Sequence, residues 1–407
     1  MKKILQFYSH IPLILRIIIG LISGILLGIT TPYLHFISLF AEVFVGLLKA
    51  IAPILVLLLI ISSLSGAEKG IASRLKTVIL FYILSTFSAS VTAVLFSYTF
   101  RITIPLTTAA NEAVPADLGA VLRNLISSAV MNPVSAIVQS NYIGILTWSV
   151  IIGLALRKCA NDKTKAVIGD LSATVSETVS WIIGLAPFGI MGLTYNTVST
   201  NGLDIIADYS KLLLLLTSCM LTVSLVIDPL IVAVALHKNP YPLVLKCLRE
   251  SGVTAFFTRS SAANIPVNLK LCEKLGLDKN YYSVAIPLGA TINMNGAAIT
   301  ITVMSLSAAF SQNIEVNIIT AILLSLLSTL GACGASGVAG GSLLLIPMAC
   351  SLLGVDPDTA MQVVGAGFII AVFQDSLETA VNSSSDVIFC ATAELREKEK
   401  IRKKLKK

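Results

Sequence analysis

Charged residues are scarce in this sequence, because Lys, Arg, Asp and Glu together make up only 13% of its 407 residues. A water-soluble domain usually has about 25% charged residues, so this shortage excludes an ordinary soluble domain. Hydrophobic residues reach 55% and the mean hydropathy is +0.87. Apolar runs of about 20 residues recur along the chain, the length that crosses a hydrocarbon core roughly 30 Å thick. The sequence therefore predicts an all-α integral membrane protein.

Histidine clusters and paired cysteines are also missing. The three histidines (His10, His35 and His237) are isolated, and the seven cysteines contain no CxxC pair. The sequence therefore indicates neither a disulfide framework nor a transition-metal site, and we expect no bound cofactor. The scattered cysteines are interpreted as small apolar packing residues.

Much of the net charge of +7 lies in the C-terminal stretch LREKEKIRKKLKK. Such a tail is typical of the cytoplasmic face of a bilayer with its anionic lipids, and it favours a membrane surface over a nucleic-acid partner. The N-terminus has the charged start and apolar core of a signal peptide, but no small-residue cleavage site follows. We therefore expect a first transmembrane helix that is retained.

Eight apolar stretches are candidate transmembrane helices. They are residues 12–31, 37–63, 77–100, 143–156, 174–198, 210–236, 282–310 and 360–393. Two further stretches, 245–275 and 317–353, are hydrophobic but interrupted by small and polar residues.

Lys and Arg are distributed unevenly between the loops. They cluster at Lys2 and Lys3, at 69–76, 157–165, 238–249 and 270–279, and in the tail, whereas the opposite loops carry only Arg101, Arg123 and Lys211. Eight crossings reproduce this asymmetry only if each interrupted stretch enters and leaves on the same side. We therefore expect eight transmembrane helices plus two re-entrant helical hairpins, with both termini cytoplasmic.

The tips of the two predicted hairpins consist of small and polar residues. The first tip is TRSSAANIP (258–266), and the second is GACGASGVAGG (331–341). Such residues end a helix inside the membrane, which is tolerated only where the backbone is buried in protein or lines a cavity. The exposed N–H, hydroxyl and carbonyl groups suit the carboxylate and ammonium of an amino acid. Two opposed tips favour a transporter's binding site over simple tight helix packing.

Residues 287–300, PLGATINMNGAAIT, interrupt another apolar span with polar residues. Asn293 and Asn295 lie close to Gly289 and Gly296, where a helix can unwind and turn carbonyl groups toward a cation. Amide, carbonyl and carboxylate oxygens suit a hard cation, so we expect Na⁺ here.

The last span contains the stretch FQDSLETAVNSSSD, residues 373–386. Its polar residues share one face of a helix: Asp375, Glu378, Thr379, Asn382 and Asp386. A carboxylate inside a membrane is costly, which favours function over a buried packing stripe. At roughly 1.5 Å per residue the two aspartates lie about 16 Å apart along the axis, so we expect two sub-sites. One carboxylate would bind a ligand's ammonium and the other a cation.

Four motifs together resemble the glutamate-transporter family of dicarboxylate/amino acid:cation symporters. They are RSSAANIP, NMNG, the glycine-rich second tip and DSLETAVNSSSD. Their order and spacing match the family from residue 12 to about 390, and the sequence is most similar to the bacterial sodium-dependent serine/threonine members. The resemblance implies a glutamate-transporter-like fold and sodium-coupled import by alternating access.

The resemblance also implies how the chain is organised. One transporter domain, 1–407, would form a homotrimer in the bacterial cytoplasmic (inner) membrane. Scaffold helices would lie at about 12–63 and 143–198. The transport domain would comprise about 77–100 and 210–393 with both hairpins, followed by a basic cytoplasmic tail, 394–407.

The resemblance assigns residues to the substrate site. Asp375 would pair with the substrate ammonium, and Asn382 and Ser261 would hold its carboxylate, with backbone of Arg259 and Ser336 nearby. The other positions implied for substrate binding are Ser260, Ala297, Gly337, Glu378 and Thr379.

Three sodium sites follow from the same resemblance, with Na⁺ as the coupling ion. The first would use carbonyl groups of Gly289, Asn293 and Asn382 and the carboxylate of Asp386. The second would lie near backbone of Thr291, Thr329, Leu330 and Ala332. The third matches Tyr82, Ser85, Thr86, Asn293 and Asn295.

Three positions depart from the family pattern. Glu378 stands where members with acidic substrates carry an arginine, so it would repel an acidic side chain and accept a hydrogen bond from a hydroxyl. Ala297 replaces a threonine that reaches the substrate side chain. Asn295 replaces the aspartate of the NMDGT pattern, which leaves the third sodium site without one negative charge and makes fewer coupled ions plausible.

Two alternatives remain open at this point. A sodium- or proton-coupled transporter of acidic amino acids or dicarboxylates would need a positive charge, such as Lys49 or Arg259, to reach the site. An intramembrane aspartyl protease would need two aspartates from different helices, whereas Asp375 and Asp386 share one helix. The sequence favours a sodium-coupled importer of serine and threonine and does not favour an enzyme.

Overall fold

The computed structural model describes residues 12–65, 73–104, 126–127, 129–139, 141–202, 204–333 and 340–405. Within these ranges the regular secondary structure is helical and includes no β-strand. Several residues that the sequence analysis used lie outside the described part: Lys2, Lys3, Lys69, Arg123, Ser336 and Gly337.

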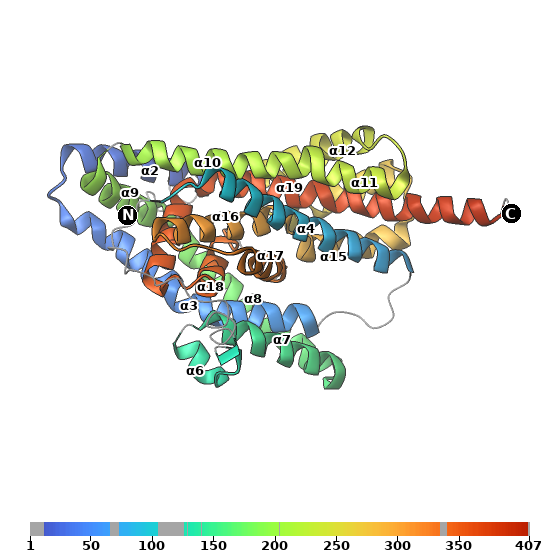
Figure 1. The fold of residues 1–407 in the computed structure, drawn as a ribbon, viewed down its shortest axis with the longest axis horizontal. Helices are drawn as coiled ribbons and strands as arrows, with labels where there is room; N and C mark the ends of the chain where they lie inside the picture. Colours follow the sequence, from blue (N-terminus) through green and yellow to red (C-terminus); the bar gives the residue numbers. More distant parts are fainter. Residues whose placement is uncertain are drawn as a thin grey trace, which may run out of the picture.

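The helices before residue 202, apart from α4 (Ser73–Phe100), pack mainly on one another. They are α2 (Leu13–Thr30), η1 (His35–Ile37), α3 (Ser38–Ser65), α6 (Pro133–Val138), α7 (Tyr142–Cys159), α8 (Asp162–Gly184) and α9 (Ala186–Asn201). The main contacts join α2 to α9 and α3 to α7, α8 and α9. In Figure 1, α3, α7 and α8 lie along one side of the molecule.

Glycines on α2 allow its close approach to α9. A Cβ atom at Gly20 would lie 2.1 Å from the carbonyl oxygen of Pro187, and one at Gly24 would lie 2.4 Å from that of Met191. Because no other residue fits at these distances, the small-xxx-small spacing of α2 determines the seam between the two helices.

The predicted span 174–198 is not one continuous helix. The chain there forms two helices, α8 and α9, that are bent by 54° at Leu185. The cause is Pro187, which occupies the first turn of α9 and has no N–H group to continue the hydrogen-bond pattern of α8.

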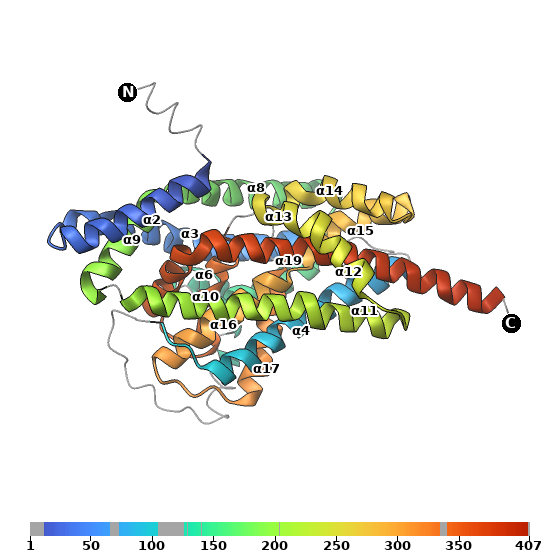
Figure 2. The ribbon, with the colours of Figure 1, turned by 90° about the horizontal axis from the view of Figure 1, so that it is seen from above.

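The second group of helices surrounds α19 (Pro357–Leu405), a helix of 49 residues. Figure 2 shows α10 running beside α19, and the C-terminal end of α19 projects beyond the other helices. The group comprises α4 (Ser73–Phe100), α10 (Asp204–Thr222), the π-helix η2 (Val223–Ile227), α11 (Asp228–Leu236), α15 (Lys279–Ile292) and α16 (Asn295–Ser311). The break between α15 and α16 falls at Asn293 and Met294, inside the interruption that the sequence indicated.

Both interrupted stretches contain several short helices. The first contains α12 (Tyr241–Cys247), the π-helix η3 (Leu248–Gly252), α13 (Val253–Thr258) and α14 (Ser261–Lys274). Arg259 turns the chain in the left-handed region at φ 52°, and the Ser260 side chain accepts a hydrogen bond from the Ala263 N–H. The second contains α17 (Ile318–Ala332), η4 (Leu343–Leu345) and α18 (Ile346–Leu352), with α17 and α18 in contact.

Several helices of the described part are long and apolar enough to cross a membrane. Five pass this test alone, and the bent pair of α8 and α9 would make a sixth. They are His35–Ser62, Leu75–Phe100, Asp208–Leu236, Lys279–Ser311 and Pro357–Ile401. Together with the exposed leucines and valines on their outer faces, they make this a multi-pass membrane protein.

Candidate functional site

A cavity of about 440 Å³ lies where the polar stripe of α19 meets the turn between α13 and α14. One wall comes from α2, α8 and α9, and the other comes from α19, the first hairpin and Gly340. Seven of the predicted substrate-binding residues line it: Arg259, Ser260, Ser261, Asp375, Glu378, Thr379 and Asn382. The structure thus brings these residues together between the two groups of helices.

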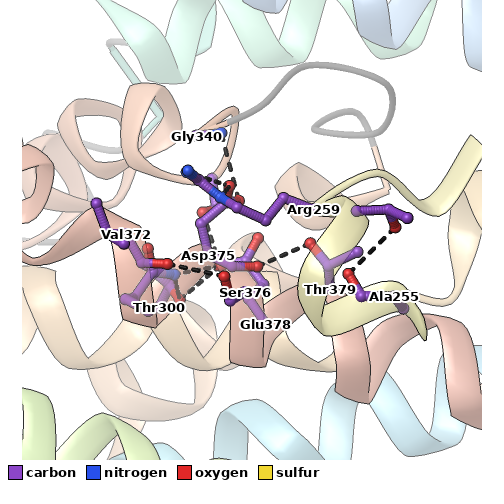
Figure 3. Close-up of polar contacts among 12 residues, drawn as sticks. Ala255, Arg259, Thr300, Gly340, Val372, Asp375, Ser376, Glu378 and Thr379 are labelled. Carbon is purple, nitrogen blue, oxygen red and sulfur yellow. Dashed lines mark hydrogen bonds and ion pairs between the residues drawn. The ribbon is translucent and has the colours of Figure 1, made fainter. Parts of the chain in front are cut away.

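Arg259 lies across Asp375 (Figure 3). Its guanidinium Nη2 is 2.7 Å and its Nε 2.9 Å from Asp375 Oδ2, while the Gly340 N–H is 3.4 Å from Oδ1. The side chains are 14% and 5% exposed, so this is a largely desolvated ion pair. Sequence reasoning expected backbone from Arg259, whereas its side chain occupies the place foreseen for the substrate's ammonium.

Glu378 is held by three donors in the same region. Its Oε2 atom accepts hydrogen bonds from Thr300 Oγ1 at 2.7 Å, Ser342 Oγ at 2.8 Å and Gln374 Nε2 at 2.5 Å. Sequence reasoning missed these three residues. Gln374 lies four positions before Glu378 on the same helix, and this spacing could have predicted their contact from the sequence. Ser342 comes from a distant segment, so no local pattern indicates its contact.

Asn382 connects α19 to the start of α16. Its side-chain Oδ1 accepts a hydrogen bond from the Gly296 N–H at 2.8 Å, which satisfies one of the first amides of α16. A Cβ atom at Gly296 would lie 2.8 Å from the backbone of Glu378, so glycine is needed for this approach. Ala297 is fully buried in α16 and does not line the cavity formed by the described residues.

Asp386 and Asn293 form a second, fully buried cluster. Asn293 Nδ2 donates to Asp386 Oδ1 at 2.9 Å and lies 3.3 Å from the Asn382 carbonyl oxygen. Asp386 Oδ2 and Asn293 Oδ1 are buried without any hydrogen-bond partner. A Cβ atom at Gly289 would be 2.8 Å from Asp386 Oδ1. Buried polar atoms normally have partners, and these orphaned oxygens are the ligands that a hard cation takes, so the donor set fits Na⁺.

The residues expected for a third sodium site also come together. Tyr82 donates to the carbonyl oxygens of Ala285 and Asp386, both at 3.2 Å. Thr86 Oγ1 donates to Asn295 Oδ1 at 3.0 Å. Ser85, however, donates to a carboxylate that sequence reasoning overlooked, Asp228, at 2.5 Å.

The residues expected for the remaining sodium site lie at the C-terminal ends of α15 and α17. The hydroxyl groups of Thr291 and Thr329 each donate a hydrogen bond to a carbonyl oxygen of their own helix. Cys333 donates to the Ile292 carbonyl oxygen at 3.3 Å, so the two helix ends meet. Leu330 is exposed and Ala332 is buried. Helix C-termini present partly negative carbonyl oxygens, which is compatible with a cation between them.

Comparison with known proteins identifies relatives over nearly the whole chain. The sequence model described as "Sodium:dicarboxylate symporter family" matches residues 13–394. A protein named "Serine/threonine transporter SstT" from Bifidobacterium adolescentis is 54% identical over 394 residues, which cover 97% of this chain and 92% of that protein. A protein of the same name from Streptococcus thermophilus is 52% identical over 396 residues, covering 97% of this chain and 98% of that protein.

Proposed function

Because this chain belongs to the sodium:dicarboxylate symporter family, we propose that it imports serine and threonine together with Na⁺. The relatives above, which are named serine/threonine transporters, support this substrate class. Membership of a family of symporters also excludes the intramembrane protease, so the protein is a transporter and not an enzyme.

The observation that carries this proposal is the pair of buried carboxylates, Asp375 and Glu378, facing one cavity. Asp375 binds the ammonium of the amino acid, which takes over the position of the Arg259 guanidinium. Asn382 and Ser261 hold the carboxylate. Glu378, which already accepts hydrogen bonds from two hydroxyl groups, accepts one more from the hydroxyl of serine or threonine.

Glu378 also sets the selectivity against acidic substrates. Among the ion pairs that the described residues form, none includes Glu378. A substrate carboxylate placed beside it would meet a like charge in a desolvated site, at a cost of several kcal/mol. Serine and threonine carry no such charge and are accepted.

Asn382 is where cation binding and substrate binding are coupled. Its carbonyl oxygen faces Asn293 in the cation cluster, and its side chain lies at the cavity. Na⁺ bound by Asp386 and Asn293 orients Asn382 and the start of α16, so the substrate binds better when the cation is present. By linkage the substrate then strengthens cation binding by the same factor.

The wider organisation belongs to the same proposal. Eight transmembrane helices and two re-entrant hairpins span the bacterial inner membrane with both termini in the cytoplasm, and three copies assemble. Residues 12–63 and 143–198 form a scaffold, and 77–100 and 210–393 form a transport domain that moves against it. The position of the cavity between two groups of helices supports this division.

An acidic amino acid is the second candidate substrate, because Arg259 does reach the cavity. The incoming ammonium would displace the Arg259 guanidinium from Asp375. The guanidinium would then be available to bind a side-chain carboxylate of the substrate. Lys49 is excluded from this role, since it pairs with Asp358. The two candidates differ in whether aspartate binds.

Equilibrium binding to the purified full-length protein tests the proposal. We expect serine to bind in NaCl at least about tenfold more tightly than in choline chloride, and aspartate not to compete. Asp386→Asn should reduce serine binding in NaCl to the level of the wild type in choline, whereas the exposed control Asp170→Asn should leave it unchanged. Tight aspartate binding would establish the second candidate instead.

A further inference from the structure

The two oxygen atoms of the Glu378 carboxylate have different surroundings. Oε2 accepts every hydrogen bond that the described residues donate to this side chain, whereas Oε1 accepts none of them. The residue is only 6% exposed, and buried polar groups normally have partners. Donors that served only to compensate the buried charge could be divided between both oxygens. Their placement on Oε2 leaves one acceptor atom of a cavity-lining carboxylate available to a ligand.

The three donors to Oε2 come from three different elements. Thr300 lies on α16, Gln374 lies on α19, and Ser342 belongs to the segment between α17 and α18. All three residues are at most 1% exposed, so their polar groups are shielded from water. Because each donor is fixed by the packing of its own element, rotation of the Glu378 carboxylate would break three hydrogen bonds at once. Such a network holds a side chain in one orientation.

Gln374 fixes the direction of the donors. Its Nε2 group donates to Glu378 Oε2 at 2.5 Å and to Thr300 Oγ1 at 2.7 Å, so both of its hydrogen atoms have an acceptor. Its Oε1 atom is buried without a hydrogen-bond partner among the described residues. With the amide turned round, that oxygen would face the carboxylate, so the amide orientation depends on Glu378. The Thr300 hydroxyl, which accepts from Gln374, has its nearest acceptor in Oε2 at 2.7 Å, since the Gly296 carbonyl oxygen is 3.1 Å away.

The segment that carries Ser342 contacts both carboxylates of the cavity. Ser342 Oγ lies 2.8 Å from Glu378 Oε2, and the Gly340 N–H lies 3.4 Å from Asp375 Oδ1. Gly340 adopts a φ of 68°, in the left-handed region that favours glycine. Asp375 is the proposed partner of the substrate's ammonium. The same short segment therefore fixes Glu378 relative to the ammonium site.

We propose that Thr300, Ser342 and Gln374 are positioning residues that hold Oε2 of Glu378 and thereby direct Oε1 to the substrate's hydroxyl group. They give the site its preference for serine and threonine over alanine, which has the same ammonium and carboxylate but no hydroxyl group. This inference rests on the proposed function and adds to it the residues that decide between these small amino acids. A site built to bind a hydroxyl group discriminates against the analogue that lacks it, because the acceptor is then left unpaired.

The ratio of the dissociation constants of alanine and serine tests the proposal. Serine is measured by equilibrium binding to the purified full-length protein in NaCl, and alanine by competition with labelled serine. We expect the wild type to bind serine at least about tenfold more tightly than alanine. Thr300→Val keeps the shape of the side chain but removes its hydroxyl group, and it should reduce this preference at least about threefold. Ser342→Ala and Gln374→Met should reduce it similarly.

Matched variants separate positioning from structure. Thr300→Ser retains the hydroxyl group and should keep the ratio of the wild type. The control is Thr302→Val on the same helix, because Thr302 is equally buried but shares its hydrogen bond with Ser90 on α4. Its ratio should be unchanged, whatever the substitution does to stability. If Thr300→Val does not fold, Ser342→Ala provides the comparison, with the buried Ser305→Ala as its control.

The outcomes that contradict the inference are distinct from those that contradict the proposed function. An unchanged ratio in Thr300→Val and Ser342→Ala would overturn the inference, and this includes an equal weakening of serine and alanine, which a purely structural role would produce. Thr300→Ser that behaved like Thr300→Val would overturn it too, as would a wild type that binds alanine as tightly as serine. Wild-type protein that binds no serine in NaCl would instead refute the proposed function.

Discussion

At the scale of single residues, two carboxylates three positions apart on α19 have different surroundings. Asp375 faces a guanidinium, and Glu378 faces two hydroxyl groups and an amide. The helical spacing made their common face predictable from sequence. Their partners were not predictable in the same way, because Thr300 and Ser342 come from other elements and no local pattern marks their contact with α19.

Glu378 is the residue at which we expect the substrate preference to change. Glu378→Arg removes the acceptor for a hydroxyl and introduces a positive charge, so serine affinity should fall at least about tenfold and aspartate should become a competitor. Competition binding with labelled serine measures both effects. Glu315→Arg, the same substitution at an exposed loop position, is the control. Unchanged serine affinity in Glu378→Arg would contradict the role given to this residue.

Arg259 is expected to act as a substitute for the substrate's ammonium. Arg259→Gln leaves Asp375 buried without a cation, which should lower the free energy of unfolding of the serine-free protein by about 3 kcal/mol. Serine then supplies the missing charge, so it should raise the melting temperature more in the variant than in the wild type. Arg249→Gln, at an exposed arginine of the same hairpin, should change neither value. Equal serine-induced shifts in Arg259→Gln and wild type would refute this role.

At the scale of helices, the sequence predicted the positions of most elements and the break between α15 and α16. The long apolar stretches became α2, α3, α4, α10 with α11, and α19, because hydrophobic length alone determines them. The bend of 54° between α8 and α9 fits the position of Pro187, a residue that kinks helices, inside an otherwise continuous apolar run. Asp228 was missed, because one acidic residue in the span 210–236 gives no periodic signal.

The seam between α2 and α9 gives a prediction about stability. In Gly24→Ala the new Cβ atom would lie 2.4 Å from the Met191 carbonyl oxygen, so the helices must separate and the free energy of unfolding should fall by about 1–3 kcal/mol. The change is followed by thermal unfolding in detergent. Gly46→Ala on α3 meets nothing within 4 Å and should be neutral or slightly stabilising. Similar melting temperatures for both variants would exclude a close-packed seam.

At the scale of the whole molecule, the cavity lies between two groups of helices, and an ion pair from Lys49 on α3 to Asp358 on α19 joins the same groups. Movement of one group against the other would open the cavity to one side of the membrane and then to the other. In the proposed movement the buried carboxylates of α19 would travel with their hairpin partners, whereas the apolar wall from α2, α8 and α9 would stay in place. Such a movement would account for a proposed substrate site at the interface between the groups and a proposed cation cluster at Asp386 inside one group.

The most direct test of sodium-coupled serine import is uptake of labelled serine into proteoliposomes that contain the wild-type protein. The rate is compared with and without an inward Na⁺ gradient, and with excess aspartate outside. We predict uptake above the equilibrium level that requires the gradient and that aspartate does not inhibit. Serine uptake that is indifferent to Na⁺ would contradict the proposed cation cluster at Asp386, and uptake abolished by aspartate would contradict the selectivity assigned to Glu378.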